Sequence, residues 1–593
     1  MTIILGISCY FHDASAALLI DGQLAAAAEE ERFTRIKHDF AFPENSIRFC
    51  LSQARLDASQ IDYVVFFEKP FVKFDRLMKT ALHGFPRTYW MFVQSMRTWL
   101  FDKLWIKSMI SKTLGVATKQ ILFAEHHISH AASAYLCSPF EESAILTYDG
   151  VGEWATTTIG YGRAEQVQII KELKFPHSLG LLYSAFTAFL GFEVNEGEYK
   201  VMGMAAYGQP RYVEKIWQVA RQSDDGHLWL DPRYFSFHYS TSRAITGKFL
   251  ELFGQVRDPS VPFFTEDTGF PSYFGERSSN YSELLKYNQY YADIAASIQQ
   301  VTEEMILTLA KEAHRETGST RLCLAGGVAL NSVANARILR ETPFEELYIQ
   351  PSAGDGGGSL GAALYVWNTV LGNSQRFVMD HASWGAEYED SEIVEAVKSK
   401  GYDYVKVNDD DRLIDLTVDR LMDDRVIGWF QGRFEWGPRA LGHRSILANP
   451  SDPKTKDIVN TKIKYREPFR PFAPSVLAVS ANDYFELENA ASSYPARFMM
   501  LVVPVKDEKK DRIGAVNHLG TARLQTVHKQ TNPLYESLIT QYGQASGTPI
   551  LLNTSFNLKG EPIVNSPIDA LNTFENSGLD SLVMGRIIVD KPS

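Results

Sequence analysis

Two histidines lie four residues apart in the stretch "AEHHISHAASAYL". Side chains one helical turn apart share a face, so the imidazoles of His126 and His130 can reach one metal ion. A polar patch on a packed helix has the same spacing. Asp149 follows a predicted strand, and Asp355 lies in the loop "SAGDGGGS". Two histidines and two carboxylates suit iron(II), manganese or zinc, although these aspartates could instead cap helices or turns.

Two glycine-rich loops each follow a predicted strand and precede a predicted helix. They are "LAGGVALN", which holds Gly326, Gly327 and Asn331, and "SAGDGGGSLGAAL". Glycine lets the backbone approach a ligand closely, and a helix N-terminus favours an anion. Neither loop has Rossmann or P-loop spacing. A nucleotide cleft of the actin and sugar-kinase type fits better, and tight turns that simply need glycine are the alternative.

A group of cations lies nearer the C-terminus, in "QGRFEWGPRALGHRSILANP", "KIKYREPFRPFAPSV" and "HLGTARLQTV". Prolines and glycines interleave them, so they do not form a helical stripe. Converging guanidinium groups suit a triphosphate or an acyl phosphate, and a solvated basic face is the alternative. Asn553, Ser555 and Asn557 follow an apolar strand and can position a small planar group. The cations are Arg433, Arg439, Arg444, Lys464, Arg466, Arg470 and Arg523.

The elements that must position these residues repeat along the chain. Residues 3–25 have the pattern strand, polar turn, strand, and residues 143–162 have it again. In each copy the first strand leads to an acidic residue, Asp13 or Asp149. The pattern predicts a duplicated α/β domain with a cleft between its halves.

Insertions and a linker divide the rest of the chain. We expect a first domain over 1–370, a linker over 371–390 and an α/β domain over 391–593. The aromatic, locally basic insertion at 71–115 is helical in period. It could line an acceptor pocket, hold a partner or touch a membrane surface, but a subdomain that packs on its own aromatics is favoured. The insertion at 233–291 has many turn signals and is typical of a lid.

Bulk properties exclude several classes of protein. The 593 residues carry a formal charge of −12, which argues against a nucleic-acid binder. The four cysteines contain no CxxC pair, so a disulfide framework is excluded and a reducing cytoplasm fits. The N-terminus lacks a basic leader and a cleavage site, and no run of about eighteen apolar residues occurs. We therefore expect a cytoplasmic protein with neither a membrane nor nucleic acid as partner.

Ten segments, taken in order, resemble the NodU/CmcH/TobZ family of O-carbamoyltransferases. The resemblance covers residues 11 to about 564, nearly the whole chain. It implies an N-terminal domain of the actin-like ATPase (ASKHA) superfamily, similar to the tRNA threonylcarbamoyl transferase, and a YrdC-like C-terminal domain. The segments include "FHDASAALLIDG", "EEERFTRIKHD", "HHISHAASAY", "DGVGEW", "GEYKVMGMAAYG", "GDGGGSLGAA", "GRFEWGPRALGHRSI", "REPFRPFAPS" and "LLNTSFNLKGEPIV".

The resemblance also implies an activity. In such enzymes the YrdC-like domain makes carbamoyl adenylate from carbamoyl phosphate and Mg-ATP, and the N-terminal domain transfers the carbamoyl group to an acceptor hydroxyl, releasing AMP. The family's iron(II) site maps onto His126, His130, Asp149 and Asp355. Seven positions match residues that hold ATP and carbamoyl phosphate: Arg439, Arg444, Lys464, Arg470, Arg523, Asn553 and Ser555.

His12 matches a family histidine near the transferred group and is the candidate general base, with an ordinary pKa near 6.5. Glu198 and Lys200 match the motif "GEYKVMG" and are further candidate catalytic residues without an assigned role. The stretch before His12 is shorter than in the aminoglycoside enzyme, which leaves the small-molecule acceptor open. A homodimer is a family-based expectation.

Three other functions are weighed against this one. An actin-fold kinase or ATPase explains the repeated hairpins and glycine loops, but it leaves the histidine pair and the arginine-rich domain without a role. A metal- and nucleotide-binding accessory protein without catalysis is the second alternative. The acidic total and the fusion of both domains in one chain disfavour tRNA modification.

Overall fold

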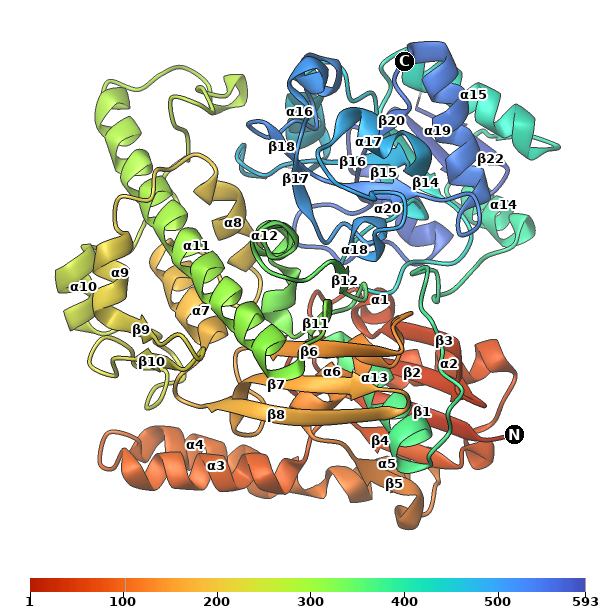
Figure 1. The fold of residues 1–593 in the computed structure, drawn as a ribbon. Coiled ribbons are helices and arrows are strands. Elements are labelled where there is room, and N and C mark those ends of the chain that lie inside the picture. The colour runs from red at the N-terminus through yellow and green to blue at the C-terminus, as the bar shows by residue number, and fades with distance from the viewer. Residues whose placement is uncertain (102, 465, 592–593) are drawn as a thin grey trace. The chain divides into compact units, whose positions relative to one another are not determined.

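The computed structural model describes residues 1–101, 103–464 and 466–591. Within it the chain forms two compact units (Figure 1). The first comprises Met1–Ala25 and Cys50–Val378, and the second comprises Ala26–Phe49 and Met379–Ser593. Residues 26–49, which the sequence assigned to the first domain, thus group with the second unit.

The first unit begins with a five-stranded sheet in the order β3-β2-β1-β4-β5. Its central strand, β1, pairs antiparallel with β2 and parallel with β4, and β4 pairs parallel with β5. The six residues of β1 are all buried, because both faces of the strand are covered. The strands are β1 (Ile3–Ser8), β2 (Ser15–Ile20), β3 (Gln23–Glu29), β4 (Tyr63–Phe66) and β5 (Ile121–Phe123).

A second five-stranded sheet repeats this topology in the order β12-β11-β6-β7-β8. Its central strand, β6, pairs antiparallel with β7 and parallel with β11, and β11 pairs parallel with β12. The duplicated α/β fold predicted from the two hairpins, the arrangement expected of an actin-like ATPase domain, is therefore confirmed. The strands are β6 (Glu142–Tyr148), β7 (Ala155–Arg163), β8 (Gln166–Lys174), β11 (Arg321–Ala325) and β12 (Glu346–Tyr348).

Helices α6 (His126–Tyr135) and α13 (Gly358–Leu364) pack against each other, and α13 also covers β1 and β2. The approach of these two helices needs a glycine. A Cβ atom on Gly361 would lie 1.8 Å from the carbonyl oxygen of Ser129 in α6. Gly361 therefore serves helix packing, and this packing brings the loop that carries Asp355 close to α6.

Longer helices complete the first unit. Helix α11 spans Tyr281–Thr317, and Gly318 closes it at a φ of 67°. The second insertion is therefore already helical from Tyr281 onward. The first insertion forms three helices, as its period predicts. The remaining helices of this unit include α3 (Pro70–His83), α4 (Tyr89–Phe101), α5 (Ile106–Leu114), α7 (Leu179–Phe189), α8 (Glu198–Ala205), α9 (Val213–Val219), α10 (Gly247–Phe253) and α12 (Ser332–Glu341).

The second unit is built on a mixed eight-stranded sheet in the order β13-β22-β21-β14-β15-β20-β16-β19. Apolar residues of its strands pack with α15 (Asp410–Met422) and α19 (Pro533–Ser546) into one core. The strands are β13 (Val405–Lys406), β14 (Ile427–Phe430), β15 (Arg444–Ala448), β16 (Ala473–Leu477), β19 (Gln525–Val527), β20 (Ile550–Ser555), β21 (Ser581–Met584) and β22 (Ile587–Asp590).

Other helices of the second unit include α1 (Glu31–Thr34), α14 (Asp390–Ser399), α16 (Lys454–Val459), α17 (Ala481–Tyr484), α18 (Tyr494–Arg497) and α20 (Pro567–Glu575). Of the helices that the structure describes in either unit, none is both long enough and apolar enough to cross a membrane.

Candidate active site

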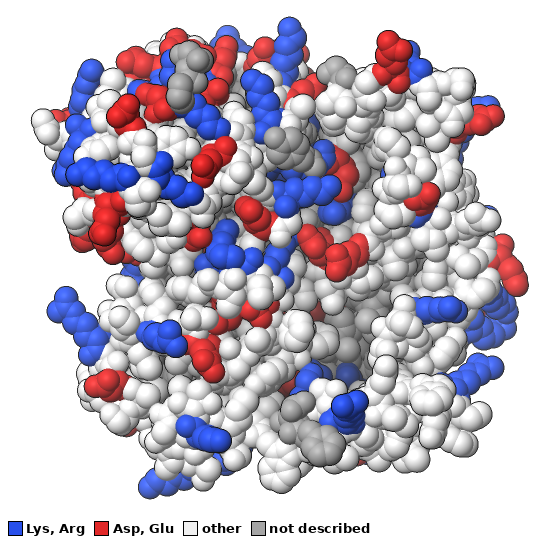
Figure 2. All heavy atoms as spheres, turned by 180° about the vertical axis from the view of Figure 1, so that it is seen from behind, with Lys and Arg blue, Asp and Glu red and all other residues white. Residues whose placement is uncertain are grey.

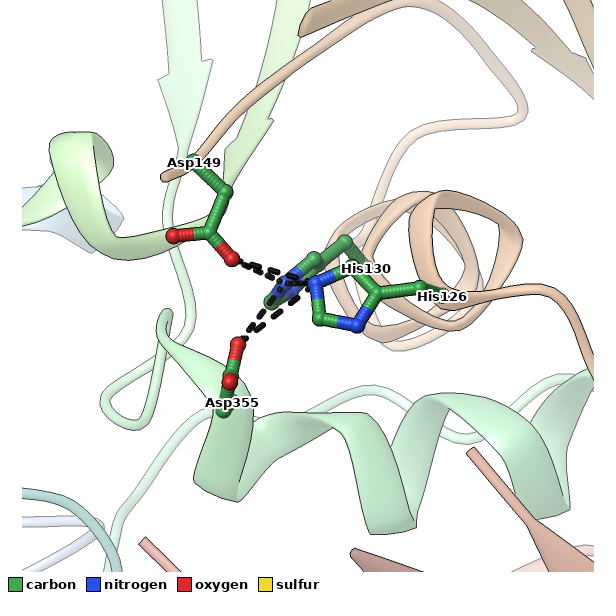
Figure 3. Close-up of side chains that lie close together, drawn as sticks. All are labelled: His126, His130, Asp149 and Asp355. Carbon is green, nitrogen blue, oxygen red and sulfur yellow. Dashed lines mark hydrogen bonds and ion pairs between the residues drawn. The ribbon is translucent and has the colours of Figure 1, made fainter. Parts of the chain in front are cut away.

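Four side chains of the first unit converge from three elements (Figure 3). His126 and His130 lie one turn apart at the start of α6. Asp149 comes directly after the last residue of β6, and Asp355 begins the short helix η6 (Asp355–Gly357). All four are at least largely buried, with His126 and His130 at 0% and 1% exposure. The structure thus brings together the four residues that the sequence proposed as metal ligands.

The distances within this quartet are those of ligands around one ion. His126 Nε2 lies 3.1 Å from His130 Nε2 and 3.1 Å from Asp149 Oδ2. Asp355 Oδ1 lies 3.6 Å from His126 Nε2 and 3.3 Å from His130 Nε2. Ligands about 2.1 Å from a metal are about 3.0 Å apart in an octahedron and about 3.4 Å apart in a tetrahedron. The donor set and its spacing therefore fit a divalent cation.

The charges of the quartet also fit a cation. Burial lowers the pKa of His130, but its hydrogen bonds to Asp149 and Asp355 outweigh burial and raise the pKa to about 9. Burial and the neighbouring Asp149 raise the pKa of Asp355. Two buried carboxylates thus require a positive charge between them, which a divalent metal supplies when it displaces the proton.

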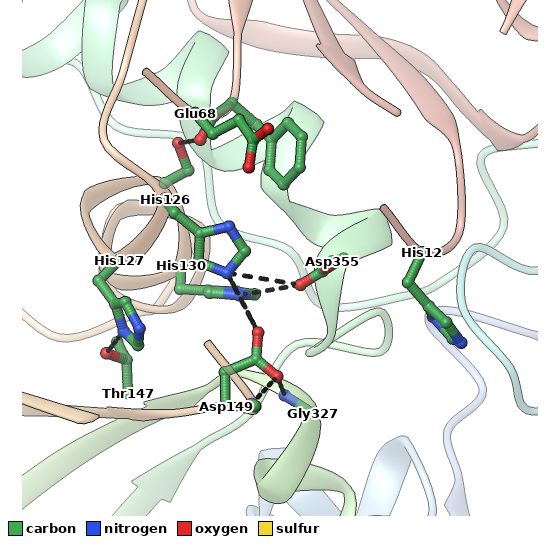
Figure 4. Close-up of polar contacts among 12 residues, drawn as sticks. His12, Glu68, His126, His127, His130, Thr147, Asp149, Gly327 and Asp355 are labelled. Atoms are coloured by element: carbon green, nitrogen blue, oxygen red, sulfur yellow. Dashed lines mark hydrogen bonds and ion pairs between the residues drawn. The ribbon is translucent and has the colours of Figure 1, made fainter. Parts of the chain in front are cut away.

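Glycine backbone fixes the position of Asp149 (Figure 4). Its Oδ1 accepts hydrogen bonds from the N–H of Gly150 at 2.7 Å and of Gly327 at 3.4 Å. Gly326 has a φ of 92°, and a Cβ there would lie 2.2 Å from the carbonyl oxygen of Tyr148. Asn331 accepts the N–H of Ala334 and so caps α12. These predicted nucleotide-binding residues therefore support Asp149 and a helix end, and a nucleotide role for them stays a prediction.

His12 lies on the turn between β1 and β2. Its Nδ1 is 2.8 Å from Asp13 Oδ2, and its Nε2 is 3.1 Å from the carbonyl oxygen of Asn195. Partial burial lowers the pKa of His12, but the charge and hydrogen bond of Asp13 outweigh it and raise the pKa to about 9. The imidazole is therefore more basic than the ordinary value of 6.5 assumed from the sequence.

Glu198 and Lys200 lie at the start of α8. Glu198 Oε1 accepts hydrogen bonds from the hydroxyl of Ser184 at 2.7 Å and from the N–H of Asn195 at 3.1 Å. Because Asn195 O faces His12, Glu198 holds the loop that contacts the candidate base. Lys200 Nζ lies 5.7 Å from the ring centre of Phe192. Glu198 is thus a candidate positioning residue, and Lys200 keeps no assigned role.

In the second unit, neighbouring cations lower the pKa values of Arg523 and Lys464. Burial and the charges of Arg439, Arg466 and Arg470 hold the pKa of Arg523 well below its ordinary range. Burial, Arg466 and Arg470 likewise lower the pKa of Lys464. Among the described residues, the buried Nε of Arg523 has no hydrogen-bond partner. Such a cluster of like charges, defined by these five residues, favours a polyanionic ligand.

Lys464 and Ser555 meet at one edge of the cluster. Lys464 Nζ donates hydrogen bonds to Ser555 Oγ at 3.3 Å and to Asn557 Oδ1 at 2.7 Å. The Ser555 hydroxyl also donates to Asn557 Oδ1, at 2.7 Å. These hydrogen bonds join Lys464 to the end of β20, and a direct ligand contact for Lys464 or Ser555 stays a prediction.

Two other predicted binding residues, Arg444 and Asn553, make hydrogen bonds within the fold. Arg444 is fully buried, lies 3.6 Å from the ring centre of Phe430 and donates to the carbonyl oxygen of Gln431 at 2.8 Å. Asn553 donates from Nδ2 to Ser475 Oγ at 3.0 Å and to Gln525 Oε1 at 2.9 Å. These contacts hold the sheet together, and a direct ligand contact for either residue stays a prediction.

The sequence reasoning missed Glu153 as a residue of the site. Its carboxylate accepts the backbone N–H of His126 at 3.0 Å and of Lys69 at 2.8 Å, so it stabilises the start of α6. Glu153 stands in the segment "DGVGEW", four residues after Asp149, which is the signal that would have found it. The same reasoning missed Asn195, because a backbone carbonyl contact has no side-chain signature.

Comparisons with known proteins agree with this layout. The family model for the carbamoyltransferase N-terminus matches residues 3–364, and that for the carbamoyltransferase C-terminus matches 418–591. An uncharacterized protein of Synechocystis is 43% identical over 100% of this chain and 97% of its own length. The nodulation protein NolNO of Sinorhizobium fredii is 36% identical over 98% of this chain and 79% of its own.

A third relative has a name that states a reaction. The 3'-hydroxymethylcephem-O-carbamoyltransferase of Streptomyces clavuligerus is 31% identical over 49% of this chain and 53% of its own length. Since the two family models together match more than half of the residues, the chain belongs to the carbamoyltransferase family, and the protein is a carbamoyltransferase with both of that family's domains.

Proposed function

We propose that the protein is an ATP-dependent O-carbamoyltransferase whose two units catalyse successive half-reactions. In the first, carbamoyl phosphate, ATP and water give carbamoyl adenylate, pyrophosphate and phosphate. In the second, an acceptor hydroxyl attacks the carbamoyl carbon, AMP leaves with the C–O bond electrons, and the hydroxyl proton passes to a base. The products are the carbamate ester and AMP, so atoms and charge balance over both steps.

The observation that carries this proposal is the cationic cluster around Arg523. Burial and the neighbouring cations lower the pKa of Arg523 and of Lys464 in this cluster, which favours a ligand with several negative charges, and ATP and carbamoyl phosphate have them. Guanidinium groups that are already desolvated stabilise the charge that develops on the α-phosphate as pyrophosphate leaves. The second unit, which we take to be YrdC-like, would therefore form the adenylate, with Mg²⁺ accompanying ATP.

Transfer is proposed for the first unit. His12 is held by Asp13 and by the Asn195 carbonyl. Because its pKa is raised to about 9, only the neutral form, which grows as the pH rises toward 9, would take the proton of the acceptor hydroxyl through Nε2. Asp13 then stabilises the imidazolium that forms. His126, His130, Asp149 and Asp355 would hold iron(II) or another divalent metal, which supplies Lewis-acid stabilisation of negative charge.

The acceptor is proposed to be a small molecule with a hydroxyl group. The name of the Streptomyces clavuligerus relative specifies a hydroxymethyl acceptor, which supports the same class here. A nucleic-acid acceptor is disfavoured by the charge of −12. We also propose a homodimer in the cytoplasm as the working form, and none of the four buried cysteines forms a disulfide in the described structure.

Variants in the two units separate this proposal from its rivals. The assay measures pyrophosphate release that depends on carbamoyl phosphate, with no acceptor present. It compares Arg523→Gln and His126→Ala with the control Arg412→Gln, in which an exposed arginine is replaced. We expect Arg523→Gln to lower the rate about 100-fold, because one charge-stabilising donor is lost. His126→Ala should keep wild-type pyrophosphate release but lose carbamoyl transfer when an acceptor is added, whereas Arg412→Gln should keep both activities. Equal rates in all three would contradict the assignment of the cluster.

A further inference from the structure

Exposed aromatic side chains concentrate in the first insertion. Five of the seven exposed aromatic residues of the described chain lie there, including both exposed tryptophans. Solvated aromatics of this size are unusual on a surface that contacts only water, and a contiguous group of them marks a contact site. They are Phe71 (72% exposed), Phe85 (70%), Tyr89 (50%), Trp90 (75%) and Trp105 (61%).

One exposed face of helix α4 carries Trp90 together with other exposed side chains. Trp90, Val93, Arg97 and Leu100 are spaced three, four and three residues apart and are all exposed, so they share a face. On the opposite side of the helix Trp99 is 4% exposed and packs against Phe74 of α3, with 5.9 Å between the ring centres. The insertion thus has its own packed interior, and the outer apolar residues are not needed to hold α3 and α4 together.

The insertion is also basic in an acidic protein. Residues 70–115 contain eight Lys and Arg against two Asp, a formal charge of +6, whereas the whole chain carries −12. Arg87, Arg97, Lys107 and Lys112 are exposed among the aromatics. Figure 2 shows the lower right of that face, where α3 and α4 lie, as white and blue atoms with hardly any red.

Exposed tryptophan, tyrosine and phenylalanine mixed with cations are typical of a surface that lies in a lipid–water interface. The aromatic rings enter the headgroup layer, and Lys and Arg are attracted by the negative potential of anionic lipids. We propose that the helices α3, α4 and α5 form a docking surface for a bilayer that contains anionic phospholipid. This docking surface departs from the expectation, made from the sequence, that no membrane is a partner.

Charge argues against a second copy of the chain as the occupant. A symmetric dimer places the same patch of each copy against the other, so a charge of +6 would face +6. An anionic bilayer offers the complementary charge together with an apolar layer. One partner then accounts for both the positive charge and the exposed aromatic rings of this surface.

The docking surface also borders the candidate transfer site. Lys103 Nζ donates a hydrogen bond to the carbonyl oxygen of Tyr10 at 2.8 Å, and the Tyr10 hydroxyl lies 2.7 Å from Met109 Sδ. Lys73 Nζ lies 4.5 Å from the ring centre of Phe11. The insertion therefore packs on the turn that carries His12. If His12 has its proposed role, a bilayer on this surface brings a membrane-bound alcohol near it.

Vesicle sedimentation tests the docking surface. The full-length protein is mixed with vesicles of phosphatidylcholine containing about 30% phosphatidylglycerol, and with vesicles of phosphatidylcholine alone. We expect sedimentation with the anionic vesicles only, and weaker binding as salt rises from about 0.05 M to about 0.5 M. Sedimentation with neither vesicle, or equally with both, would overturn the proposal.

Two double variants assign the binding to these residues. Phe85→Ser with Trp90→Ser should lower the vesicle partition coefficient about tenfold or more, since two exposed rings that would enter the headgroup layer are lost. The matched control is Val405→Ser with Val479→Ser, which removes exposed apolar residues elsewhere and should bind like the wild type. Equal binding by both double variants would overturn the proposal.

Two further measurements exclude other causes. Circular dichroism spectra and thermal unfolding of the same samples should match those of the wild type, which shows that the variants are folded and keeps the result independent of the proposed function. Light scattering reports oligomeric state. If Phe85→Ser with Trp90→Ser converted dimer to monomer while vesicle binding was absent in the wild type, the face would be an interface between copies, and the membrane proposal would be wrong.

Discussion

His528 illustrates, at the scale of one residue, how charge limits the stability of the second unit. Burial and the nearby Arg497 lower its pKa to about 4. Between about pH 6.5 and pH 4 the unfolded chain binds a proton on this histidine that the folded chain does not bind. The contribution of neutral His528 to the free energy of unfolding is therefore complete above pH 6.5. It falls as the pH drops through this window, by about 3 kcal/mol at most.

Replacing His528 by glutamine removes this proton without removing a polar side chain. Between about pH 7 and pH 4.5, the free energy of unfolding of the second unit should fall by about 2 kcal/mol less in His528→Gln than in the wild type. Urea unfolding at both pH values measures the difference, and His83→Gln at an exposed position is the control. If the free energy of unfolding of His528→Gln depended on pH as in the wild type, a group other than His528 would titrate, which would contradict this prediction.

Residue types predicted part of the site. His126, His130, Asp149 and Asp355 could be named because helical spacing and strand ends leave few other places for their side chains. Arg444 could not be distinguished from the other arginines, because only the packed structure shows it stacked on Phe430. The same holds for His12, whose pKa depends on contacts with Asp13 and Asn195 that no spacing predicts.

At the scale of elements, the turn after β11 determines where Asp149 lies. Gly326 has a left-handed φ of 92° and touches the carbonyl of Tyr148, the residue before Asp149. A methyl group there must displace either β6 or the glycine loop. Gly318, at the end of α11, has a φ of 67° with no atom near its missing Cβ.

These two glycines form a matched pair. We expect Gly318→Ala to cost about 1 kcal/mol, the ordinary penalty of a left-handed alanine. Gly326→Ala should cost several times more, because a displaced backbone adds a steric term. It should also weaken binding of added Co²⁺ to the quartet, followed by titration calorimetry. An equal loss of stability in both variants would contradict the close approach at Gly326.

Hairpins and helix ends were predictable because their signals are local. The strand–turn–strand patterns at 3–25 and 143–162 and the stop at Gly318 depend on neighbouring residues alone. The start of α11 at Tyr281 was not predicted, since its first turns lie within a segment rich in turn signals and are stabilised by packing. The grouping of residues 26–49 with the second unit likewise depends on contacts far apart in the chain.

The whole molecule combines two kinds of charged site in one chain. The first unit holds a quartet of histidines and aspartates that fits a cation, and the second holds a cluster of cations that fits polyanions. A family of carbamoyltransferases with both domains accounts for this pairing. In the proposed mechanism the intermediate, carbamoyl adenylate, hydrolyses readily, so its formation and use by one chain would limit its loss to water.

The products of ATP test this account most directly. Purified protein loaded with iron(II) is incubated with Mg-ATP, carbamoyl phosphate and a mixture of candidate alcohols, and the nucleotides are followed by ³¹P NMR. We expect AMP and pyrophosphate in equal amounts, formed only when carbamoyl phosphate is present. Cleavage of ATP to ADP and phosphate, whatever else is added, would contradict it and indicate an actin-fold kinase or ATPase.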